Sequence, residues 1–308
     1  MSQPVLEVRG LCKRFGEITA VDELNLTIHP GDVYGFIGPN GAGKTTTIRM
    51  ILGLIHSDAG EVKIFGYDLK RDYRRALSEI GALVESPAFY PFLSGYRNLR
   101  LFGDLSQRVS RERIYQVLEL VGLSRRAHHR VRGYSQGMRQ RLGIALALLH
   151  QPKLLILDEP TNGLDPQGIR EVRNLIRRIS QEEKITIFLS SHLLGEMEKL
   201  CNRVGIIYRG RLIAEGDVDE LLGKEQDFVE IQVENTESAQ RFLKEKFAGL
   251  NPEIKKAGWL EFKKENWGLA EINQALVQAG FKVFSIYPHR RTLEDLFVEL
   301  TGESADVY

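Results

Sequence analysis

Nine residues, GPNGAGKTT at positions 38–46, constrain the fold of this chain more than any other stretch. They match the pattern GxxxxGK[ST], follow the apolar run VYGFIG, and precede the apolar-periodic stretch TTTIRMILGLI. This order predicts a buried strand, a glycine-rich loop and a helix. Glycines let successive backbone N–H groups turn inward around phosphate oxygens, and the positive end of the following helix points at the same anion. The stretch therefore predicts a phosphate-binding loop in an α/β fold.

Two side chains of this loop have a specific chemical role. Lys44 is placed to reach the β- and γ-phosphates of a nucleotide, and the Thr45 hydroxyl is placed to ligate Mg²⁺. The alternative is a flexible turn that matches the pattern by chance, but the strand before it and the helix after it favour nucleotide binding. The residues expected to hold the nucleotide are Gly38, Pro39, Asn40, Gly41, Ala42, Gly43, Lys44, Thr45 and Thr46.

Two adjacent acids follow a second buried strand. The stretch LLILDEP, residues 154–160, places Asp158 and Glu159 at the end of an apolar run. Strand carboxyl ends face the ligand crevice of a parallel α/β sheet, so Asp158 is predicted to hold Mg²⁺ and Glu159 to act as general base toward the attacking water. The alternative is an acidic turn after a core strand. The phosphate loop in the same chain favours the catalytic role.

A histidine ends the next apolar strand, ITIFLSSH, residues 185–192. A lone histidine at a strand end is more often a structural hydrogen-bonding residue than a catalytic one. This strand follows the Asp158 strand in the predicted parallel sheet. His192 is therefore expected near the γ-phosphate, where it would bond that phosphate and orient Glu159 and the water.

The remaining patterns outline two domains. Short alternating segments between Val5 and Ile64 predict antiparallel strands, and residues 94–150 carry apolar residues three and four apart, as helices do. Strands then alternate with helices at about 167–180 and 192–201, which predicts a parallel sheet covered by helices. Composition changes near residue 225. We therefore expect a nucleotide-binding domain at 1–225 and a small α/β domain at 226–308.

Bulk properties exclude several classes of protein. Lys+Arg 42 against Asp+Glu 41 gives a net charge of +1, which offers no broad attraction to nucleic acid or to an anionic membrane. Cys12 and Cys201 lie far apart, so neither a disulfide framework nor a thiolate metal site is indicated. The longest apolar run, residues 142–157, is interrupted by HQPK and falls short of the roughly 18 residues of a membrane-spanning helix.

Five ordered motifs, GPNGAGKTT, YSQGMRQR, LLILDEP, NGLDP and SSH, together resemble the ATPase subunit of an ABC transporter over residues 5 to about 222. The resemblance implies a P-loop NTPase with a parallel core sheet, an antiparallel β subdomain and a helical subdomain. YSQGM resembles the LSGGQ signature, with Tyr134, Gln136 and Met138 as departures. Ser135 and Gly137 are retained, and the resemblance implies that they contact the γ-phosphate of an ATP bound to a second copy.

Further residues gain a role only through this resemblance. Phe15 matches the aromatic side chain that stacks on adenine, and Asp165 in NGLDP matches the loop that communicates between the two sites of a dimer. Glu85 stands where the family usually has a glutamine that touches Mg²⁺ and water, so it is a possible metal ligand alongside Thr45 and Asp158; an ordinary surface acid is the alternative. The aromatic residues after it are expected to form the surface that receives a helix of the membrane subunit: Phe89, Tyr90, Phe92 and Tyr96.

The stretch VESPAFYP and the ending TLEDLFVELTG resemble ATPase subunits of bacterial exporters of the bacitracin-resistance and drug-efflux type. The implied protein binds ATP and Mg²⁺, hydrolyses ATP as a homodimer, and drives separate polytopic permease subunits from the cytoplasmic face of the membrane. With one phosphate loop and one signature per chain, the helix that begins near Ser135 should lie far from its own loop and complete the site of the partner copy. The cargo is not indicated.

Two other functions fit the phosphate loop. A soluble ABC ATPase that acts on DNA or ribosomes typically carries a coiled-coil insertion or two ATPase domains, and neither pattern is present. A switch GTPase or a small-molecule kinase would leave the other four motifs unexplained, and the guanine-reading NKxD pattern is absent. The transporter ATPase is the function that accounts for all five motifs.

Overall fold

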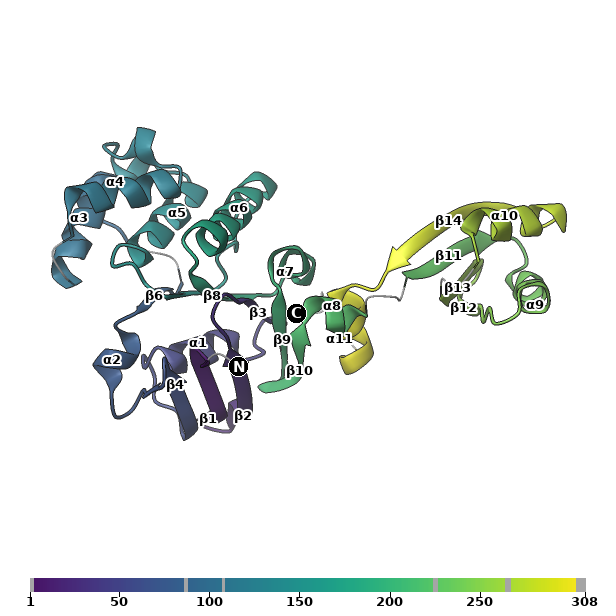
Figure 1. Ribbon diagram of the computed structural model, residues 1–308, viewed down its shortest axis with the longest axis horizontal. Helices are drawn as coiled ribbons and strands as arrows, with labels where there is room; N and C mark the ends of the chain where they lie inside the picture. The colour runs from purple at the N-terminus through teal and green to yellow at the C-terminus, as the bar shows by residue number, and fades with distance from the viewer. Residues whose placement is uncertain (1–2, 86–87, 107–108, 224–226, 264–266, 303–308) are drawn as a thin grey trace. The chain divides into compact units, whose positions relative to one another are not determined.

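The computed structural model of the chain describes residues 3–85, 88–106, 109–223, 227–263 and 267–302. It divides into two compact units (Figure 1), the first formed by Met1–Val218 with Phe297–Tyr308 and the second by Asp219–Leu296. The sequence predicted a single break near residue 225. In the structure the first unit ends at Val218 and also includes the last helix from Phe297 onward, whose buried ring packs edge-on against Tyr208 with 5.9 Å between ring centres.

A six-stranded sheet forms the centre of the first unit. Its five strands from β9 to β6 run parallel, and only β10 pairs antiparallel at the edge. Every residue of β3, β7 and β8 is buried, which suits the mainly apolar sequences of these central strands. In sheet order the strands are β10 (Arg211–Asp217), β9 (Arg203–Tyr208), β3 (Val33–Ile37), β8 (Thr186–Ser191), β7 (Leu154–Leu157) and β6 (Ile80–Leu83).

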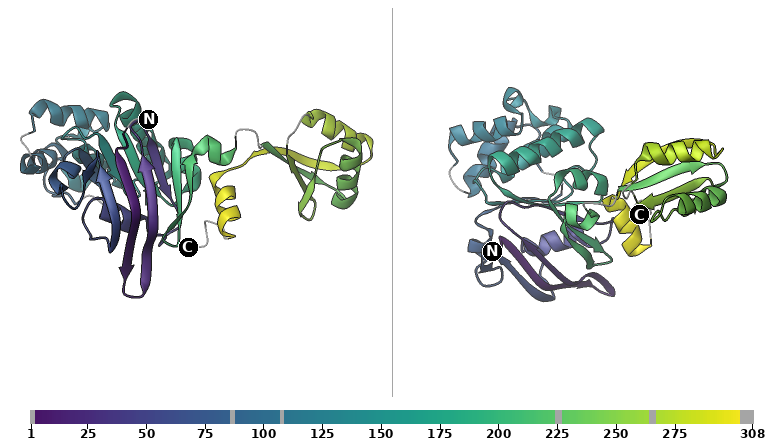
Figure 2. Two further views of the ribbon diagram at one scale, coloured as in Figure 1. Left: turned by 60° about the horizontal axis from the view of Figure 1, so that its bottom comes forward. Right: turned by 45° about the vertical axis from the view of Figure 1, so that its right-hand side comes forward.

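The predicted antiparallel strands form a second sheet in the same unit. Residues of β1 pair antiparallel with both β2 and β4, and the long β1–β2 hairpin is the purple pair in Figure 2. Apolar side chains of this sheet share one core with residues of β3 and α1, which fixes the strand before the phosphate loop and the helix after it. In sheet order the strands are β2 (Ile18–Ile28), β1 (Leu6–Phe15), β4 (Ala59–Ile64) and β5 (Tyr67–Asp68).

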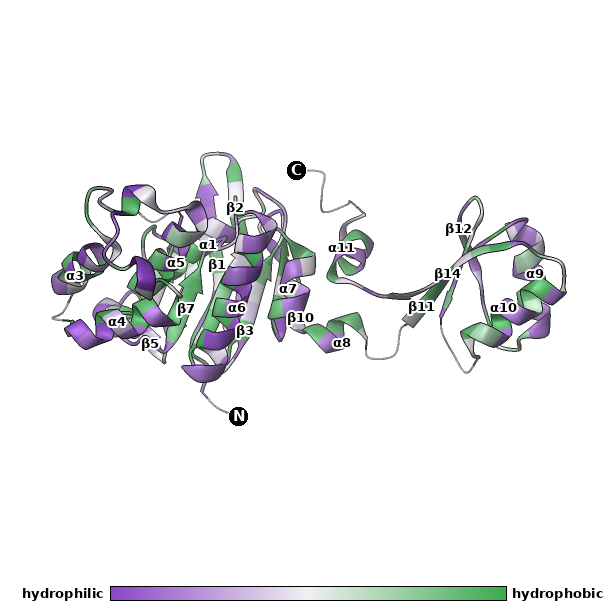
Figure 3. Cartoon of the chain, turned by 90° about the horizontal axis from the view of Figure 1, so that it is seen from above, coloured by the Kyte–Doolittle hydropathy of each residue, from purple (hydrophilic) through white to green (hydrophobic). Residues whose placement is uncertain are grey.

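Helices surround these sheets. α3, α4 and α5 contact one another and form the predicted helical subdomain, seen together in Figure 1. The P-loop α/β architecture with its two subdomains is thus confirmed. Within the described ranges, no helix is long and apolar enough to cross a membrane, and Figure 3 shows polar residues interrupting the apolar ones along α6. The helices are α1 (Lys44–Ile51), α2 (Tyr73–Leu77), α3 (Gly95–Ser106), α4 (Arg111–Leu120), α5 (Gln136–Ala147), α6 (Pro166–Glu182) and α7 (Leu194–Leu200).

The second unit contains an antiparallel sheet and two helices that share a separate apolar core. β11 lies between β13 and β14 in this sheet, and β12 pairs with β13. The elements of this part of the chain are α8 (Val218–Leu222), β11 (Asp227–Val233), α9 (Thr236–Lys246), β12 (Glu253–Lys256), β13 (Trp259–Lys263), α10 (Leu269–Gln278), β14 (Val283–Arg290) and α11 (Leu293–Thr301).

Candidate active site

The phosphate loop connects the buried end of β3 to the first turn of α1. Gly43 directly precedes α1 with φ +110°, and Gly41 has φ +77°, both in the region that favours glycine. Space also demands glycine here, because a Cβ on Gly38 would lie 2.1 Å from the carbonyl oxygen of Ile207 and one on Gly43 would lie 2.4 Å from that of Ala20. The loop is therefore fixed by neighbouring backbone from β9 and β2.

The ammonium of Lys44 is buried within this loop. Its Nζ donates hydrogen bonds to the carbonyl oxygens of Gly38 at 2.7 Å and Pro39 at 3.0 Å. It also forms an ion pair with Glu159 Oε1 at 3.2 Å. A charge that is only 5% exposed needs such partners to offset its desolvation. The lysine of the loop and the predicted general base are thus in direct contact.

The two acids lie at the carboxyl end of β7, beside the end of β8. Asp158 is buried and Glu159 partly buried, and the Ser190 hydroxyl from β8 links them. That hydroxyl donates to Asp158 Oδ1 at 2.6 Å and accepts from the backbone N–H of Glu159 at 2.9 Å. Glu159 has φ +47°, a left-handed conformation that costs a non-glycine residue roughly 1–2 kcal/mol. The local structure therefore accepts strain to place this carboxylate.

His192 contacts the predicted base directly. Its Nδ1 lies 2.9 Å from Glu159 Oε2, so the two oxygens of Glu159 face Lys44 and His192. The histidine side chain is 30% exposed, although His192 is not among the described residues that line the cavities below. The parallel pairing of β7 with β8 brings these residues together, as the sequence pattern predicted.

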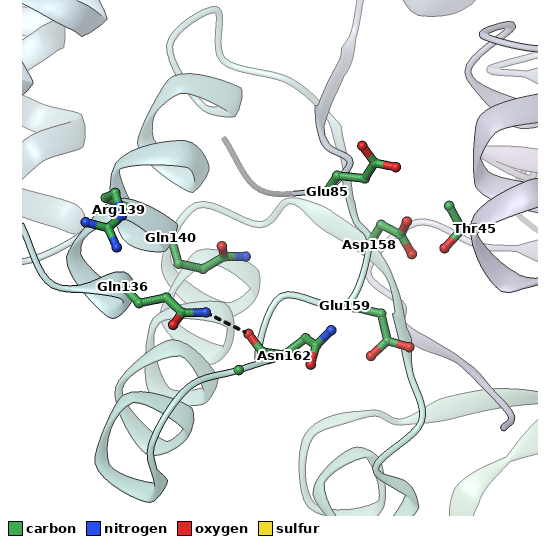
Figure 4. Close-up of a pocket in the computed structure, with 9 residues that line it drawn as sticks. Thr45, Glu85, Gln136, Arg139, Gln140, Asp158, Glu159 and Asn162 are labelled. Carbon is green, nitrogen blue, oxygen red and sulfur yellow. Dashed lines mark hydrogen bonds between the residues drawn. The ribbon is translucent and has the colours of Figure 1, made fainter. Parts of the chain in front are cut away.

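These side chains line two adjoining cavities that share Thr45, Glu159 and Asn162. The first has a volume of about 390 Å³, and Figure 4 shows the acids and Thr45 facing side chains of α5 across it. The second, of about 310 Å³, lies against the phosphate loop. The first is lined by Thr45, Glu85, Gln136, Arg139, Gln140, Asp158, Glu159, Asn162 and Gly163. The second is lined by Ala20, Asn40, Gly41, Gly43, Lys44, Thr45, Thr46, Glu159 and Asn162.

One side chain at the opening of α5 reaches the first cavity. Gln136 lines this cavity opposite Thr45, and its Nε2 donates to the Asn162 carbonyl at 3.4 Å. Ser135 and Gly137 are not among the described residues that line either cavity.

Ser135 begins α5 as its N-cap. Its exposed hydroxyl accepts from the N–H of Met138 at 3.2 Å, which satisfies one free donor of the first turn. Gly137 has open space where a Cβ would stand. Tyr134, which replaces the leucine of the family signature, is buried and donates to the Arg126 carbonyl at 2.6 Å, and burial raises the pKa of its hydroxyl.

Three other predicted site residues have partners within their own chain. Asp165 is exposed and caps α6, with its Oδ1 accepting from the N–H of Gly168 at 2.9 Å. Phe15 is 51% exposed at the end of β1, where the ammonium of Lys13 lies 5.4 Å from its ring centre. Glu85 lines the first cavity but forms an ion pair with Arg49.

The donors present fit Mg²⁺. This ion takes one or two carboxylates, with waters and substrate phosphates supplying the other oxygens. Thr45 and Asp158 line one cavity beside the phosphate loop, and the Ser190 bond to one oxygen of Asp158 leaves the other for a cation. No group of three His, Cys, Asp or Glu side chains among the described residues could hold a metal alone, as expected for a site completed by phosphate oxygens.

The predicted aromatic residues divide between two ring clusters. The aromatic patch consists of Phe89, Tyr90 and Phe92 together with Phe102 of α3, whose ring stacks on Tyr90 at 6.0 Å. Tyr90 and Phe92 are 44% and 63% exposed. Tyr96 belongs elsewhere, because its ring contacts Tyr115 and His128.

Sequence reasoning missed three parts of the site. Ser190 and Ser191 are adjacent in the sequence before His192, and no pattern indicates which of the two hydroxyls links the acids. Gln136 was noted only as a departure from the signature. Asn162 precedes a glycine in NGLDP, which marks a turn but not the α5 contact.

A phosphate loop whose lysine touches a carboxylate, with a second carboxylate able to hold Mg²⁺, defines a nucleotide-hydrolysing P-loop protein. The family model described as "ABC transporter" matches residues 21–162. The chain is 43% identical to the uncharacterized ABC transporter ATP-binding protein YhcH of Bacillus subtilis, covering 98% of this chain and 97% of that protein. It is 41% identical to the bacitracin transport ATP-binding protein BcrA of Bacillus licheniformis, covering 97% of each chain.

A solved structure extends this likeness. A post-hydrolysis dimer of an ATP-binding cassette, bound to ADP and Pi, matches with a TM-score of 0.61 and 25% identity, over 69% of this chain and 98% of that one. The chain belongs to the ATP-binding proteins of ABC transporters. It is accordingly an ATPase, and it is the ATP-binding subunit of such a transporter.

Proposed function

We propose that two copies of this chain bind two ATP molecules between them and drive separate permease subunits of an exporter. The observation that carries this proposal is the open surface at the beginning of α5, where Ser135 is exposed as the N-cap and Gly137 has open space where a Cβ would stand. The Ser135 hydroxyl is exposed, and its hydrogen remains available to a γ-phosphate of the other copy. Asp165, also exposed, would lie at the same dimer interface.

Within each site, the phosphate loop and Phe15 would bind ATP. Backbone N–H groups of 38–46 and the α1 N-terminus bind the phosphates, while Phe15 stacks on adenine. Thr45 and Asp158 would hold Mg²⁺, with Glu85 as a further ligand if the nucleotide displaces Arg49. When bound, this ion neutralises charge on the β- and γ-phosphates.

Lys44 supports a specific role for Glu159. The γ-phosphate would compete with the Glu159 carboxylate for the Lys44 ammonium, since it carries more negative charge than one carboxylate and lies where the phosphate loop directs this lysine. Transfer of Lys44 to phosphate releases Glu159 Oε1, now 3.2 Å from Nζ, to accept a proton from the attacking water. His192 lies 2.9 Å from the other oxygen of Glu159, and it would also bond the γ-phosphate. ATP binding would thus free its own general base.

The aromatic patch is the proposed docking surface for a permease helix. The rings of Tyr90 and Phe92 are exposed next to each other, and an exposed group of aromatic rings is typical of a surface that binds another protein. Docking here would hold the chain at the cytoplasmic face of the membrane. ATP-driven closure of the dimer and its release after hydrolysis would then move the permease.

A role in membrane transport is supported by BcrA, whose name assigns it to bacitracin transport and which aligns along almost the whole chain. The experiment is purification of the tagged chain from detergent-extracted membranes of its own organism. We expect a polytopic membrane protein in near-equal amount. Recovery of ribosomes or DNA with no membrane protein would instead support the soluble class of ABC ATPase and overturn the proposal.

A further inference from the structure

A strongly basic cavity lies beside the aromatic patch and outside the nucleotide site. The segment SRRAHHRVRG, residues 124–133, contains four arginines and no acidic residue in a chain of net charge +1. A cavity of about 490 Å³ is lined by Arg126, His129, Arg130, Arg132, Gly133, Tyr134 and Met138. We call it the arginine cavity.

The arginines of this cavity lack partners of opposite charge. In the part of the chain that the structure describes, the guanidinium groups of Arg126, Arg130 and Arg132 form no ion pair or side-chain hydrogen bond. All three residues are exposed. Three positive charges around one hollow raise the local potential there, so an anion that enters it is attracted by all three. A planar guanidinium matches carboxylate or phosphate through two parallel hydrogen bonds.

Backbone hydrogen bonds attach this cavity to the aromatic patch. The N–H of Arg132 donates to the Pro91 carbonyl at 2.9 Å, and the N–H of Val131 donates to the Leu93 carbonyl at 2.9 Å. Arg130 also pairs with Ser94 as a β-bridge. The carbonyls of 91 and 93 flank the exposed Phe92 ring, so one ligand segment can contact the rings and the guanidinium groups together.

We propose that the arginine cavity binds a carboxylate side chain of the permease segment that docks on the aromatic patch. This inference rests on the proposed function and adds the chemistry of its partner: a helix with apolar residues for Tyr90 and Phe92 and an Asp or Glu placed to enter the cavity. Apolar contact supplies part of the affinity, and the charge pair adds to it, selects the partner and fixes its register. Because Met138 of α5 also lines the cavity, this carboxylate lies one turn from Ser135.

The test uses the complex purified from native membranes. In the variant Arg130→Lys, a carbodiimide can join the new amine directly to a carboxylate in contact, and mass spectrometry identifies the joined peptides. The matched control is Arg125→Lys, in the same exposed segment but outside the cavity. We expect a cross-link from position 130 to an Asp or Glu of the membrane subunit and none from position 125.

A second pair of variants measures dependence on charge. Arg126→Gln with Arg130→Gln should lower recovery of the membrane subunit at least tenfold, whereas Arg125→Gln should retain it; unchanged melting temperatures verify folding. The inference is overturned if the cavity variants recover as much membrane subunit as the wild type and no cross-link forms from position 130. The proposed function stands in that case, because the membrane subunit is still recovered. If the wild type recovers none, both are overturned. Arginine-dependent binding of the isolated chain to phosphatidylglycerol vesicles, with no cross-link, would assign the cavity to lipid instead.

Discussion

The hydroxyl of Ser190 and the carboxylate of Asp158 form a buried hydrogen bond of 2.6 Å across the carboxyl ends of two neighbouring parallel strands. The same hydroxyl accepts from the N–H of Glu159, so one serine of β8 fixes both acids of β7. Because Ser190 has no exposed surface, water cannot replace it in either bond. The acid pair is therefore positioned from the adjacent strand rather than by its own turn alone.

Ser190→Ala should impair hydrolysis without removing any group that contacts ATP. Loss of the hydroxyl leaves an oxygen of Asp158 and a backbone donor without a partner, which costs about 1–3 kcal/mol of stability. Orienting groups around a metal ligand typically contribute 10- to 100-fold, so we expect kcat to fall by roughly that factor and the Mg²⁺ needed for half-maximal rate to rise. Phosphate release against Mg²⁺ concentration measures both. Ser191→Ala, which removes a hydroxyl bonded to the N–H of Leu193, should leave the Mg²⁺ requirement unchanged.

Glu159→Gln tests the general base. The amide keeps the shape of the side chain but cannot take a proton, so steady hydrolysis should fall by about 10²–10⁴-fold. ATP binding should persist, because the neutral amide no longer competes with phosphate for Lys44. Size-exclusion chromatography with light scattering should then show an ATP-dependent dimer. Turnover near the wild-type rate would remove Glu159 from the mechanism.

The sequence predicted the architecture and the main site residues because both depend on local patterns. The phosphate loop, the acid pair and His192 all follow short apolar strands, and parallel pairing necessarily brings strand ends together. Ser190 and Gln136 were missed for the opposite reason. Their partners lie 32 and 26 residues away, and which of two serines faces the acids depends on how β8 turns at its end. The packing of Phe297 against Tyr208 likewise joins residues that are far apart in the sequence.

Substitutions of Ser135 separate helix capping from assembly. Asn and Asp both replace serine well as N-caps, so Ser135→Asn and Ser135→Asp should melt within a few degrees of the wild type. Only the aspartate places a negative charge against the γ-phosphate of the partner's ATP, a repulsion that the proposed dimer cannot tolerate. We expect Ser135→Asp to bind ATP as a monomer, to fail to dimerise in the Glu159→Gln background, and to lose turnover. Dimerisation of Ser135→Asp equal to that of Ser135→Asn would contradict the composite site.

Gly163→Ala should disturb the NGLDP loop for two separable reasons. Gly163 has φ +72°, and an added Cβ would lie 2.6 Å from Nε2 of Gln136. The positive φ angle costs any L-residue about 1 kcal/mol of stability. The close contact adds the cost of displacing the Gln136 side chain. Gly16→Ala is the control, because Gly16 has φ +59° but an added Cβ would meet open space. The loss of stability in this variant measures the cost of the positive φ angle alone. Urea unfolding should show a larger loss for Gly163→Ala, and Gln136→Ala should remove the difference.

Cys201 should make the stability of the first unit depend on alkaline pH. Burial raises the pKa of its thiol, so the folded state keeps the proton at pH values where the unfolded state has released it. The unfolded state then binds fewer protons, and the free energy of unfolding falls as pH rises above the unfolded thiol pKa of about 8.5, by at most about 1.4 kcal/mol per pH unit. Below that pH the contribution is fully present. Urea unfolding of the wild type and Cys201→Ala between about pH 7.5 and 9.5 should give a steeper decline for the wild type; parallel curves would show that the buried thiol does not titrate on unfolding.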